Sequence, residues 1–438
     1  MKNLLDKVVA KGADKGEIFY QQKTIEQIDF KGNKLNQVSS KKLRGINFKV
    51  VKDGKVGSIS SSDLSSPDKM VDKVLEIVEY GDEMKYDFNQ PGLEYPEYKY
   101  TDDRNYQESV ETLVEKGEEI VKRILNYEEN FQTEISIERS REETAIYNTH
   151  GLDLETAKDE YYIQAYGLLV EGDNFTTVIE AESAEEGKID FDGIADRLIE
   201  KLKLARKVVS LESGKYSVIF TPRAVAQMCS ALEGLYGENV VEGVSPVKDK
   251  VDQQIFSDKI TIKDNGKMKD GLQSKTFDDE GTPMQETVLV ENGILKEFIH
   301  SLESADKAET RATGNVKRGS YSNAGRLGFT NLIIEAGETS FDEMIKDIDE
   351  GMVIDNISGL IMGNTIQGNI DSDIDMGYKI ENGKMVGRVK NGAIGTNIYK
   401  LLTDNLVAVE DQIRPMLSRG FVAYVPHILC QDVNVTIG

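Results

Sequence analysis

Hydrophobic positions in the first half of the chain follow helical spacing in some segments and strand-like runs in others. Apolar residues that recur every three or four positions predict amphipathic helices near 3–11, 70–78, 110–125 and 194–205. Strand-like runs are joined by turn residues such as Asp53-Gly54, a pair that supplies the positive φ angles of a tight turn. The runs predict strands at 18–30, 35–40, 46–51, 56–59, 134–147 and 152–171.

Short strand-like runs dominate the second half. An apolar run at 216–220 leads into Thr221-Pro222, which predicts the N-cap and first residue of a helix that carries apolar residues as far as Leu235. Proline suits that first position because its missing N–H has no partner there in any helix. Asn-Gly pairs, each between two strand-like runs, occur at 292–293, 382–383 and 391–392.

One further helix interrupts these strands, since Ser340 and Glu343 have the spacing of a capping box. The whole pattern indicates an α+β fold with two domains. We expect an N-terminal α/β domain with hairpins and long helices over 1–210, subdivided near 82–105. The C-terminal domain, over 211–438, is expected to be an antiparallel β-rich body resembling a barrel.

Composition and charge narrow the class of protein. The 438 residues are 39% hydrophobic and 30% charged, which suits a soluble globular protein. The net charge of −24 argues against binding to nucleic acid or to an anionic membrane surface, because both interactions rely on Lys and Arg. No apolar run is long enough to span a membrane, and the first residues lack the apolar region of a signal peptide. The two cysteines, Cys229 and Cys430, do not form a disulfide framework, so we expect a reducing, cytoplasmic location.

Histidine and nucleophile motifs do not indicate a catalytic centre. The three histidines, His150, His300 and His427, are distant in sequence, and a helical zinc site needs two ligands one turn apart. A Gly-x-Ser-x-Gly motif and the glycine-rich loops that bind phosphate are both missing from the sequence.

An acidic run and a basic stretch are the remaining polar candidates. Asp278, Asp279 and Glu280 run into a Gly-Thr-Pro turn, where they either bind a hard cation through oxygen ligands or form a solvated corner. The stretch 311–318 carries three positive charges among small residues. It is suited to pair with a peptide carboxylate or with the acidic turn, and its simpler interpretation is a surface loop.

The order of short motifs along the chain resembles the TldD/PmbA family, the so-called modulators of DNA gyrase. Gly12-Ala13-Asp14 resembles the start of that family. In the second half, family-like motifs follow one another at 278–283, 291–295, 312–315, 331–337, 425–429 and 432–435. Each motif alone is weak, and the resemblance rests on their number and order over nearly the whole chain.

A missing motif indicates the branch of the family. TldD-type chains carry His-Glu-x-x-x-His on a helix and are zinc-dependent peptidases, whereas TldE/PmbA-type chains lack the motif and pair with TldD. In the matching segment Cys229 stands at the first histidine, Ser230 at the glutamate and Gly234 at the second histidine. The resemblance therefore implies a TldE/PmbA-type subunit with no catalytic residue and no cofactor of its own. Zinc is expected only in a TldD-type partner.

The resemblance also implies partners and substrates. A TldD/TldE-type zinc metallopeptidase complex degrades unfolded or extended peptides, processes a peptide antibiotic and degrades an antitoxin. We expect a TldD-like subunit in a heterodimer, or a second copy of this chain in a homodimer, together with an extended peptide. Asp278, Asp279, Glu280, Arg311 and Asn315 are the candidate substrate-binding residues.

Two other interpretations stay open at this point. One is an autonomous hydrolase that uses a different centre, such as a cation held by Asp278, Asp279 and Glu280. The other is a homodimeric peptide-binding or scaffold protein without a peptidase partner. A direct role on DNA is not expected, because a net charge of −24 opposes binding to phosphate backbones.

Overall fold

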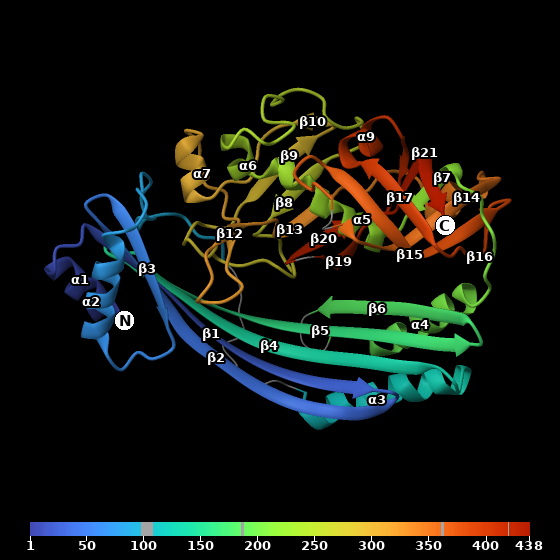
Figure 1. Ribbon diagram of the computed structural model, residues 1–438, viewed down its shortest axis with the longest axis horizontal. Coiled ribbons are helices and arrows are strands. Elements are labelled where there is room, and N and C mark those ends of the chain that lie inside the picture. The colour runs from blue at the N-terminus through green and yellow to red at the C-terminus, as the bar shows by residue number, and fades with distance from the viewer. Residues whose placement is uncertain (98–107, 185–187, 361–362, 419) are drawn as a thin grey trace.

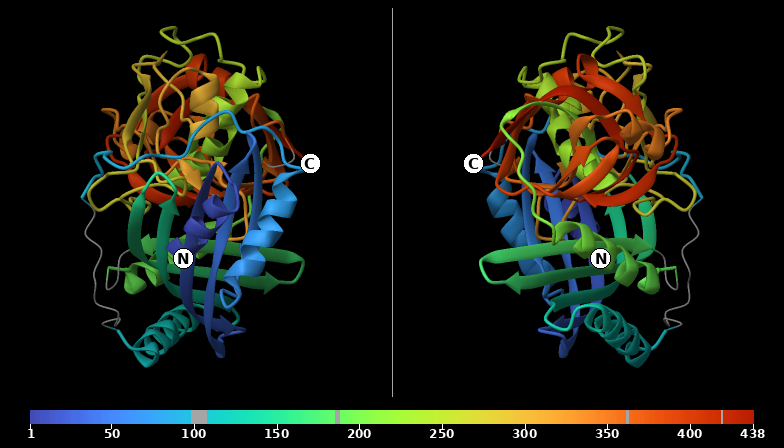
Figure 2. Two further views of the ribbon diagram at one scale, coloured as in Figure 1. Left: turned by 90° about the vertical axis from the view of Figure 1, so that its left-hand side faces the viewer. Right: turned by 90° about the vertical axis from the view of Figure 1, so that its right-hand side faces the viewer.

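The computed structural model describes residues 1–97, 108–184, 188–360, 363–418 and 420–438. Its two halves lie one against the other. A long curved sheet from the first half runs beneath a β-rich body from the second half (Figure 1). The views along the long axis show the same two layers, with the sheet below the body (Figure 2).

The first half forms a six-stranded antiparallel sheet in the order β3-β2-β1-β4-β5-β6. Its strands are β1 (Lys15–Lys31), β2 (Lys34–Lys52), β3 (Lys55–Ser61), β4 (Gln132–Asn148), β5 (Asp153–Glu171) and β6 (Asn174–Ala184). Strand β1 pairs with both β2 and β4, so the segments on either side of the 82–105 connection share one sheet. The predicted limits of the domains stay a prediction.

Strand β2 differs from the prediction, which places two separate strands at 35–40 and 46–51. The structure has one strand of 19 residues. Its charged central residues Lys41, Lys42 and Arg44 are exposed but remain paired with β1. Their polarity indicated a break, whereas continuous pairing with a long neighbouring strand satisfies the backbone along the whole length.

Helices cover the two ends of this sheet. At one end lie α1 (Lys2–Ala10) and α2 (Pro67–Val78), and at the other α3 (Val110–Tyr127) and α4 (Phe191–Ala205) (Figure 1). Each places an apolar stripe on the sheet, and Val8, Val74, Leu113 and Ile194 are fully buried. Burying one such side chain contributes about 1.5–3 kcal/mol, so the helices and the sheet stabilise each other. The four predicted helices are all present.

The second half contains a closed barrel of five strands in the order β14-β7-β21-β17-β15, because β14 pairs with both β7 and β15. A second six-stranded sheet has the order β10-β9-β8-β13-β20-β19. The strands are β7 (Gly214–Phe220), β8 (Ile262–Asn265), β9 (Glu286–Glu291), β10 (Ile294–Leu295), β11 (Val316–Lys317), β12 (Arg326–Leu327), β13 (Asn331–Ile334), β14 (Glu350–Ser358), β15 (Asn369–Glu381), β16 (Lys384–Arg388), β17 (Gly392–Asn397), β18 (Leu406–Val409), β19 (Arg414–Ser418), β20 (Phe421–Val425) and β21 (Ile428–Ile437).

The predicted α+β class and barrel-like C-terminal body are confirmed. Two pairs, β7 with β14 and β13 with β20, run parallel, so the second half is not wholly antiparallel. Two of the three Asn-Gly pairs lie in hairpin turns, while the pair at 391–392 leads into β17, which shares the neighbour β15 with β16. The predicted capping box is present, since the Ser340 hydroxyl accepts from the Glu343 backbone N–H.

The helices of the second half are short. They are α5 (Pro222–Met228), the 3₁₀ helix η1 (Cys229–Leu235), α6 (Gly237–Val241), α7 (Leu302–Lys307), α8 (Phe341–Lys346) and α9 (Ile398–Thr403). Helix α5 is almost wholly buried and contacts β14, β19 and β20, so it lies between the barrel and the second sheet. Thr221 caps it as predicted, with its hydroxyl accepting from the Ala224 backbone N–H.

Specific contacts join the two halves. A glycine in β2, Gly45, lies directly under the ring of Tyr321, which would overlap any Cβ at that position. The Tyr321 backbone N–H donates to Oε1 of Gln21 at 2.8 Å. The Arg318 guanidinium lies 4.6 Å from the centre of the Phe19 ring. These contacts dock β1 and β2 of the sheet against the segment 318–321 of the second half.

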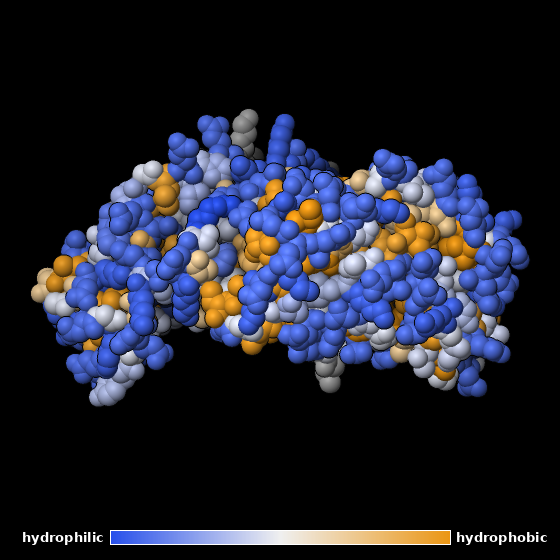
Figure 3. Space-filling model, turned by 90° about the horizontal axis from the view of Figure 1, so that it is seen from above, coloured by the Kyte–Doolittle hydropathy of each residue, from blue (hydrophilic) through white to orange (hydrophobic). Residues whose placement is uncertain are grey.

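The hydrophilic surface of the molecule agrees with the high share of charged residues in the chain. Seen from the side of the C-terminal half, it is mostly hydrophilic, with apolar side chains in separate groups (Figure 3). Among the described residues, no helix has both the length and the apolar character needed to cross a membrane.

Candidate functional site

The acidic turn lies at the junction of the two halves, and Asp278 forms its centre. This side chain is 1% exposed. The backbone N–H groups of Glu280 and Thr282 donate to its Oδ1, each at 2.9 Å, and the Val316 N–H donates to its Oδ2 at 2.9 Å. Burial and the nearby charge of Glu280 raise the pKa of Asp278 to about 8, while the three N–H donors act in the opposite direction.

The other two carboxylates of the turn also bind backbone. Oδ2 of Asp279 accepts from the Arg318 backbone N–H at 2.6 Å, and its Oδ1 lies 3.7 Å from Nζ of Lys275. Glu280 accepts from the Leu302 N–H at 2.9 Å, and burial raises the pKa of this side chain. These carboxylates therefore bind β11 and the start of α7 to the turn.

Side chains of the first half hold the turn from its other side. Nδ2 of Asn89 donates to the Glu280 carbonyl at 2.9 Å and to the Thr282 hydroxyl at 3.0 Å. The Tyr95 hydroxyl donates to the Gly281 carbonyl at 3.1 Å. Both faces of the turn are occupied by protein groups, so its geometry favours a structural joint over an open cation site.

Arg311 and Asn315 do not converge on the acidic carboxylates. Arg311 forms a two-pronged ion pair with Glu297, both distances being 3.0 Å, and it is about half exposed. Asn315 is buried and donates to Oδ2 of Asp264 at 2.6 Å. Arg311 does line an open hollow of about 600 Å³ together with Thr282 of the turn.

The sequence predicts one continuous helix for the segment that matches the zinc motif. The structure instead has α5 followed by the 3₁₀ helix η1. Cys229, Ser230 and Gly234 lie in η1, and all three are buried. Serine and glycine are weaker helix formers than alanine, which agrees with the change to a tighter, less regular helix. Burial raises the pKa of the Cys229 thiol to about 12, so it stays protonated and is a poor metal ligand.

These three positions do not fit a zinc ion. A Cβ added to Gly234 would overlap the Tyr399 hydroxyl and lie 3.0 Å from the Ile366 carbonyl oxygen, so a larger ligand side chain has no room there. Across the part of the chain that the structure describes, no group of three His, Cys, Asp or Glu side chains is placed to hold a metal. The same finding gives no support to a cation at the acidic turn. That this chain works without a metal of its own stays a prediction.

A polar cavity lies beside the turn, between the sheet and the C-terminal half. It measures about 490 Å³ and is lined by six basic side chains and three acidic ones. We call it the basic cavity; its charged lining is Lys23, Lys158, Lys275, Lys317, Arg318, Arg326, Glu142, Glu160 and Asp279. In a chain with 53 basic and 77 acidic residues, this local excess of positive charge is opposite to the average.

Strand register brings the sheet side of the basic cavity together. Lys23 in β1 is opposite Glu142 in β4, which is opposite Lys158 in β5. Nζ of Lys158 lies 2.6 Å from Oε1 of Glu160, two residues further along β5. Burial opposes the charge of Glu160, but Lys158 outweighs it and holds the pKa of Glu160 at about 2.

Two partly buried lysines, Lys275 and Lys317, lie on the other wall. Lys317 donates to the carbonyls of Phe329 and Gly420 at 2.7 and 2.8 Å, and burial lowers its pKa to about 7. Burial also disfavours the charged form of Lys275, but Asp279 and Glu142 outweigh it and raise its pKa.

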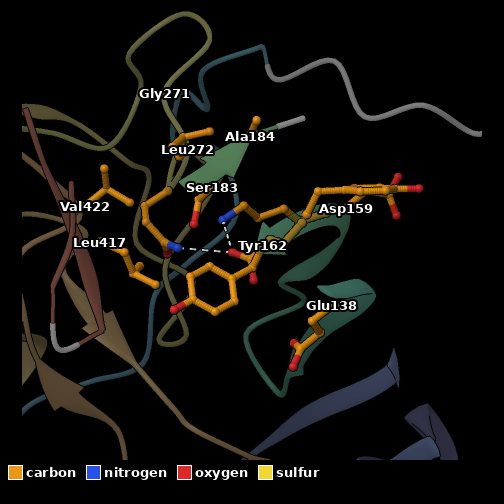
Figure 4. Close-up of a pocket in the computed structure, with 13 residues that line it drawn as sticks. Glu138, Asp159, Tyr162, Ser183, Ala184, Gly271, Leu272, Leu417 and Val422 are labelled. Carbon is orange, nitrogen blue, oxygen red and sulfur yellow. Dashed lines mark hydrogen bonds and ion pairs between the residues drawn. The ribbon is translucent and has the colours of Figure 1, made fainter. Parts of the chain in front are cut away.

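A narrower cavity of about 180 Å³ adjoins the basic cavity and shares three lining residues with it, Lys158, Glu160 and Gln273. In Figure 4, Leu417 and Val422 of the C-terminal half lie on one side of this pocket, and Tyr162 and Glu138 of the sheet lie on the other. Nε2 of Gln273 donates to Oε1 of Glu160 at 3.1 Å across it.

Sequence reasoning identified part of this region. The basic stretch 311–318 contributes Lys317 and Arg318 to the cavity, although Arg311 points elsewhere. Lys23, Lys158 and Lys275 gave no signal, because each is an isolated lysine in its own segment. Only strand register and the docking of the two halves bring them together.

Comparison with known proteins identifies the family to which this architecture belongs. A family model described as the PmbA/TldA metallopeptidase C-terminal domain matches residues 213–437, and a model of domain 1 of the same family matches residues 16–78. The chain belongs to the PmbA/TldD family. An uncharacterised protein of Methanocaldococcus jannaschii is 27% identical over 435 residues, which cover 97% of this chain and 99% of that protein. A protein of Buchnera aphidicola named as a metalloprotease TldD homolog is 35% identical over 158 residues, 36% of this chain and 32% of that protein.

Solved structures agree with this assignment to the PmbA/TldD family. TldE from Thermococcus kodakarensis superposes with a TM-score of 0.91 at 25% identity, covering 100% of this chain and 99% of that one. A Thermotoga maritima protein, provisionally named a modulator of a DNA gyrase, gives 0.89 at 26% identity and covers 99% of both chains. The resemblance to this family, drawn from short motifs, is therefore confirmed.

Proposed function

We propose that this chain is a non-catalytic subunit of a TldD/TldE-type zinc metallopeptidase complex and acts with a TldD-type partner. The observation that carries the proposal is the segment at the zinc-motif position. Cys229, Ser230 and Gly234 are buried in a 3₁₀ helix, and they supply neither a set of metal ligands nor a carboxylate to activate water. The likeness to TldE over the full length of the chain supports the same role.

The contribution of this subunit would be to hold an extended peptide. Strand β19 is the last strand of its sheet, and Leu417 on it is 50% exposed where it lines the narrower cavity. An outer strand offers N–H and C=O groups to which a peptide adds as another strand. Unfolded or extended peptides, including a peptide antibiotic precursor or an antitoxin, are the proposed substrates, and the cytoplasm is the proposed location.

Geometry favours this role over an autonomous hydrolase. The carboxylates of Asp278 and Asp279 already accept backbone N–H groups, so they are poorly placed to bind a catalytic cation or a water nucleophile. The homodimeric scaffold without a peptidase partner stays a prediction.

The test is co-expression with a TldD-type chain from the same genome. We expect the two chains to co-purify, zinc to be present at one ion per TldD-type chain, and cleavage of an unfolded peptide to require both. A partner variant whose motif glutamate is replaced by glutamine is the matched control and should bind but not cleave. If the isolated chain binds zinc stoichiometrically and cleaves peptide in a chelator-sensitive way, the proposal is wrong.

A further inference from the structure

The basic cavity has more positive charge than its own carboxylates neutralise. Arg318 and Arg326 line it, and neither forms an ion pair with a carboxylate among the residues that the structure describes. Arg318 is 8% exposed, and its Nε–H is buried without an acceptor. A buried donor of a charged group costs free energy when it is left without a partner, so this wall is suited to an acceptor from outside the chain.

Lys23 and Lys275, the two lysines near Glu142, also have N–H groups available for hydrogen bonds. Nζ of Lys23 lies 3.9 Å from Oε2 of Glu142, and Nζ of Lys275 lies 3.9 Å from Oε1 of the same side chain. Lys275 approaches Asp279 at 3.7 Å. All three distances exceed a hydrogen bond, and no hydrogen bond of either ammonium group is found within the described ranges. The ammonium groups of Lys23 and Lys275 therefore flank the Glu142 carboxylate, and their N–H groups are available to an added acceptor.

We propose that the basic cavity is a binding site for an oxyanion, a carboxylate or phosphate group, held by Lys275 and Arg318 with Lys23, Lys317 and Arg326 around it. Ammonium and guanidinium donors form short, charge-assisted hydrogen bonds with both kinds of oxyanion. The site does not depend on the metallopeptidase role proposed above, since it is a property of the isolated chain.

Two sources supply this chemistry. The first is a small free anion, which a volume of about 490 Å³ accommodates readily. The second is the C-terminal carboxylate of a peptide, with its preceding residues in the adjoining cavity lined by Leu417 and Val422 (Figure 4). The two cavities adjoin at Lys158, Glu160 and Gln273, so a peptide whose terminus lies in the basic cavity has the narrower cavity beside it.

The experiment measures the melting temperature and binding heat of the full-length chain with three probes: inorganic phosphate, a tetra-alanine peptide with a free C-terminal carboxylate, and the same peptide amidated. Sodium chloride at equal ionic strength is the salt control. We expect at least one of the first two probes to raise the melting temperature in a saturable way. Stabilisation by phosphate alone assigns the site to a free anion. Stabilisation by the free-acid peptide but not by its amide assigns it to a chain terminus.

Variants locate the effect. Lys275→Met should weaken binding about tenfold or more, the loss expected for a buried charge-assisted hydrogen bond. Arg326→Gln changes an exposed side chain that forms no ion pair with the residues described, so it should weaken binding about threefold. This variant keeps the test valid if the first one does not fold. Lys384→Met removes the same charge from an exposed position in β16 and should leave binding unchanged. Failure of both anions to bind, or equal weakening by Lys384→Met, would overturn the proposal.

Discussion

Replacing Asp278 by alanine tests whether the acidic turn is a structural joint. The substitution leaves three backbone N–H groups, those of Glu280, Thr282 and Val316, without their acceptor in a site where the side chain is 1% exposed. Each buried donor without a partner costs about 1–3 kcal/mol. Because water will reach some of them after the truncation, we expect a loss of about 3–6 kcal/mol, a large share of the stability of a typical domain.

The assay is thermal unfolding followed by circular dichroism and calorimetry. For a domain of about 150–250 residues, 1 kcal/mol corresponds to about 2–4 °C, so the transition of Asp278→Ala should fall by about 6 °C or more. Asp306→Ala is the control, because Asp306 is exposed on α7 and its side chain forms no hydrogen bond among the described residues. An Asp278→Ala protein that melts within 1–2 °C of the wild type would refute the structural account, and the turn would then be a candidate for chemistry after all.

Three further predictions concern buried charges and thiols. The pKa of Asp278 is raised to about 8 in the folded chain from an ordinary 3.8, so this residue contributes stability that is present below about pH 4 and lost as the pH rises towards 8. Asp278→Asn should therefore flatten the dependence of the unfolding free energy on pH over this range, measured by urea titrations at several pH values. Lys201→Ala should cost about 1.5–3 kcal/mol in urea unfolding, because it removes the nearest cation from two buried carboxylates, Glu180 at 2.6 Å and Asp355 at 2.7 Å from its Nζ, which keep only weaker partners. Lys203→Ala on the same helix should change little, and equal effects of the two variants would contradict the account. Cys229 and Cys430 should resist a thiol reagent at pH 8 and react rapidly in urea, since both are buried with raised pKa values. Fast labelling of Cys229 in the folded chain would contradict this and show that η1 opens.

The fold was predictable from sequence where a residue's environment depends on its near neighbours. The stripes of α3 and α4, the Thr221-Pro222 helix start and the Ser340 capping box all appear as expected, because spacing and capping are local. Strand β2 was divided in error, because the partner that holds its charged centre is a different strand. The barrel was expected only in outline, since the closing pair β14–β15 and the parallel pair β7–β14 depend on long-range register.

The candidate site was predictable to a smaller degree. The acidic turn was located correctly as a feature, but its burial and its backbone partners depend on β11 and on Asn89 and Tyr95, which are far away in sequence. Whether Asp278 binds substrate stays a prediction that its hydrogen bonds do not favour. The basic cavity was predictable only through the stretch 311–318, because its other charges come from β1, β4, β5, β12 and the segment before the acidic turn, which long-range pairing and docking bring together.

The contact between Gly45 and Tyr321 has a consequence for exchanging parts between relatives. The ring lies where a side chain on residue 45 would begin, so even an alanine there requires the Tyr321 side chain to move from its present position. A chimera that combines the first half of one family member with the second half of another will therefore assemble well only if both positions come from compatible parents. Transferring Gly45 and Tyr321 together is the smallest exchange that preserves this contact between the two halves. It gives protein engineers a single pair of positions to check before the crossover point is chosen.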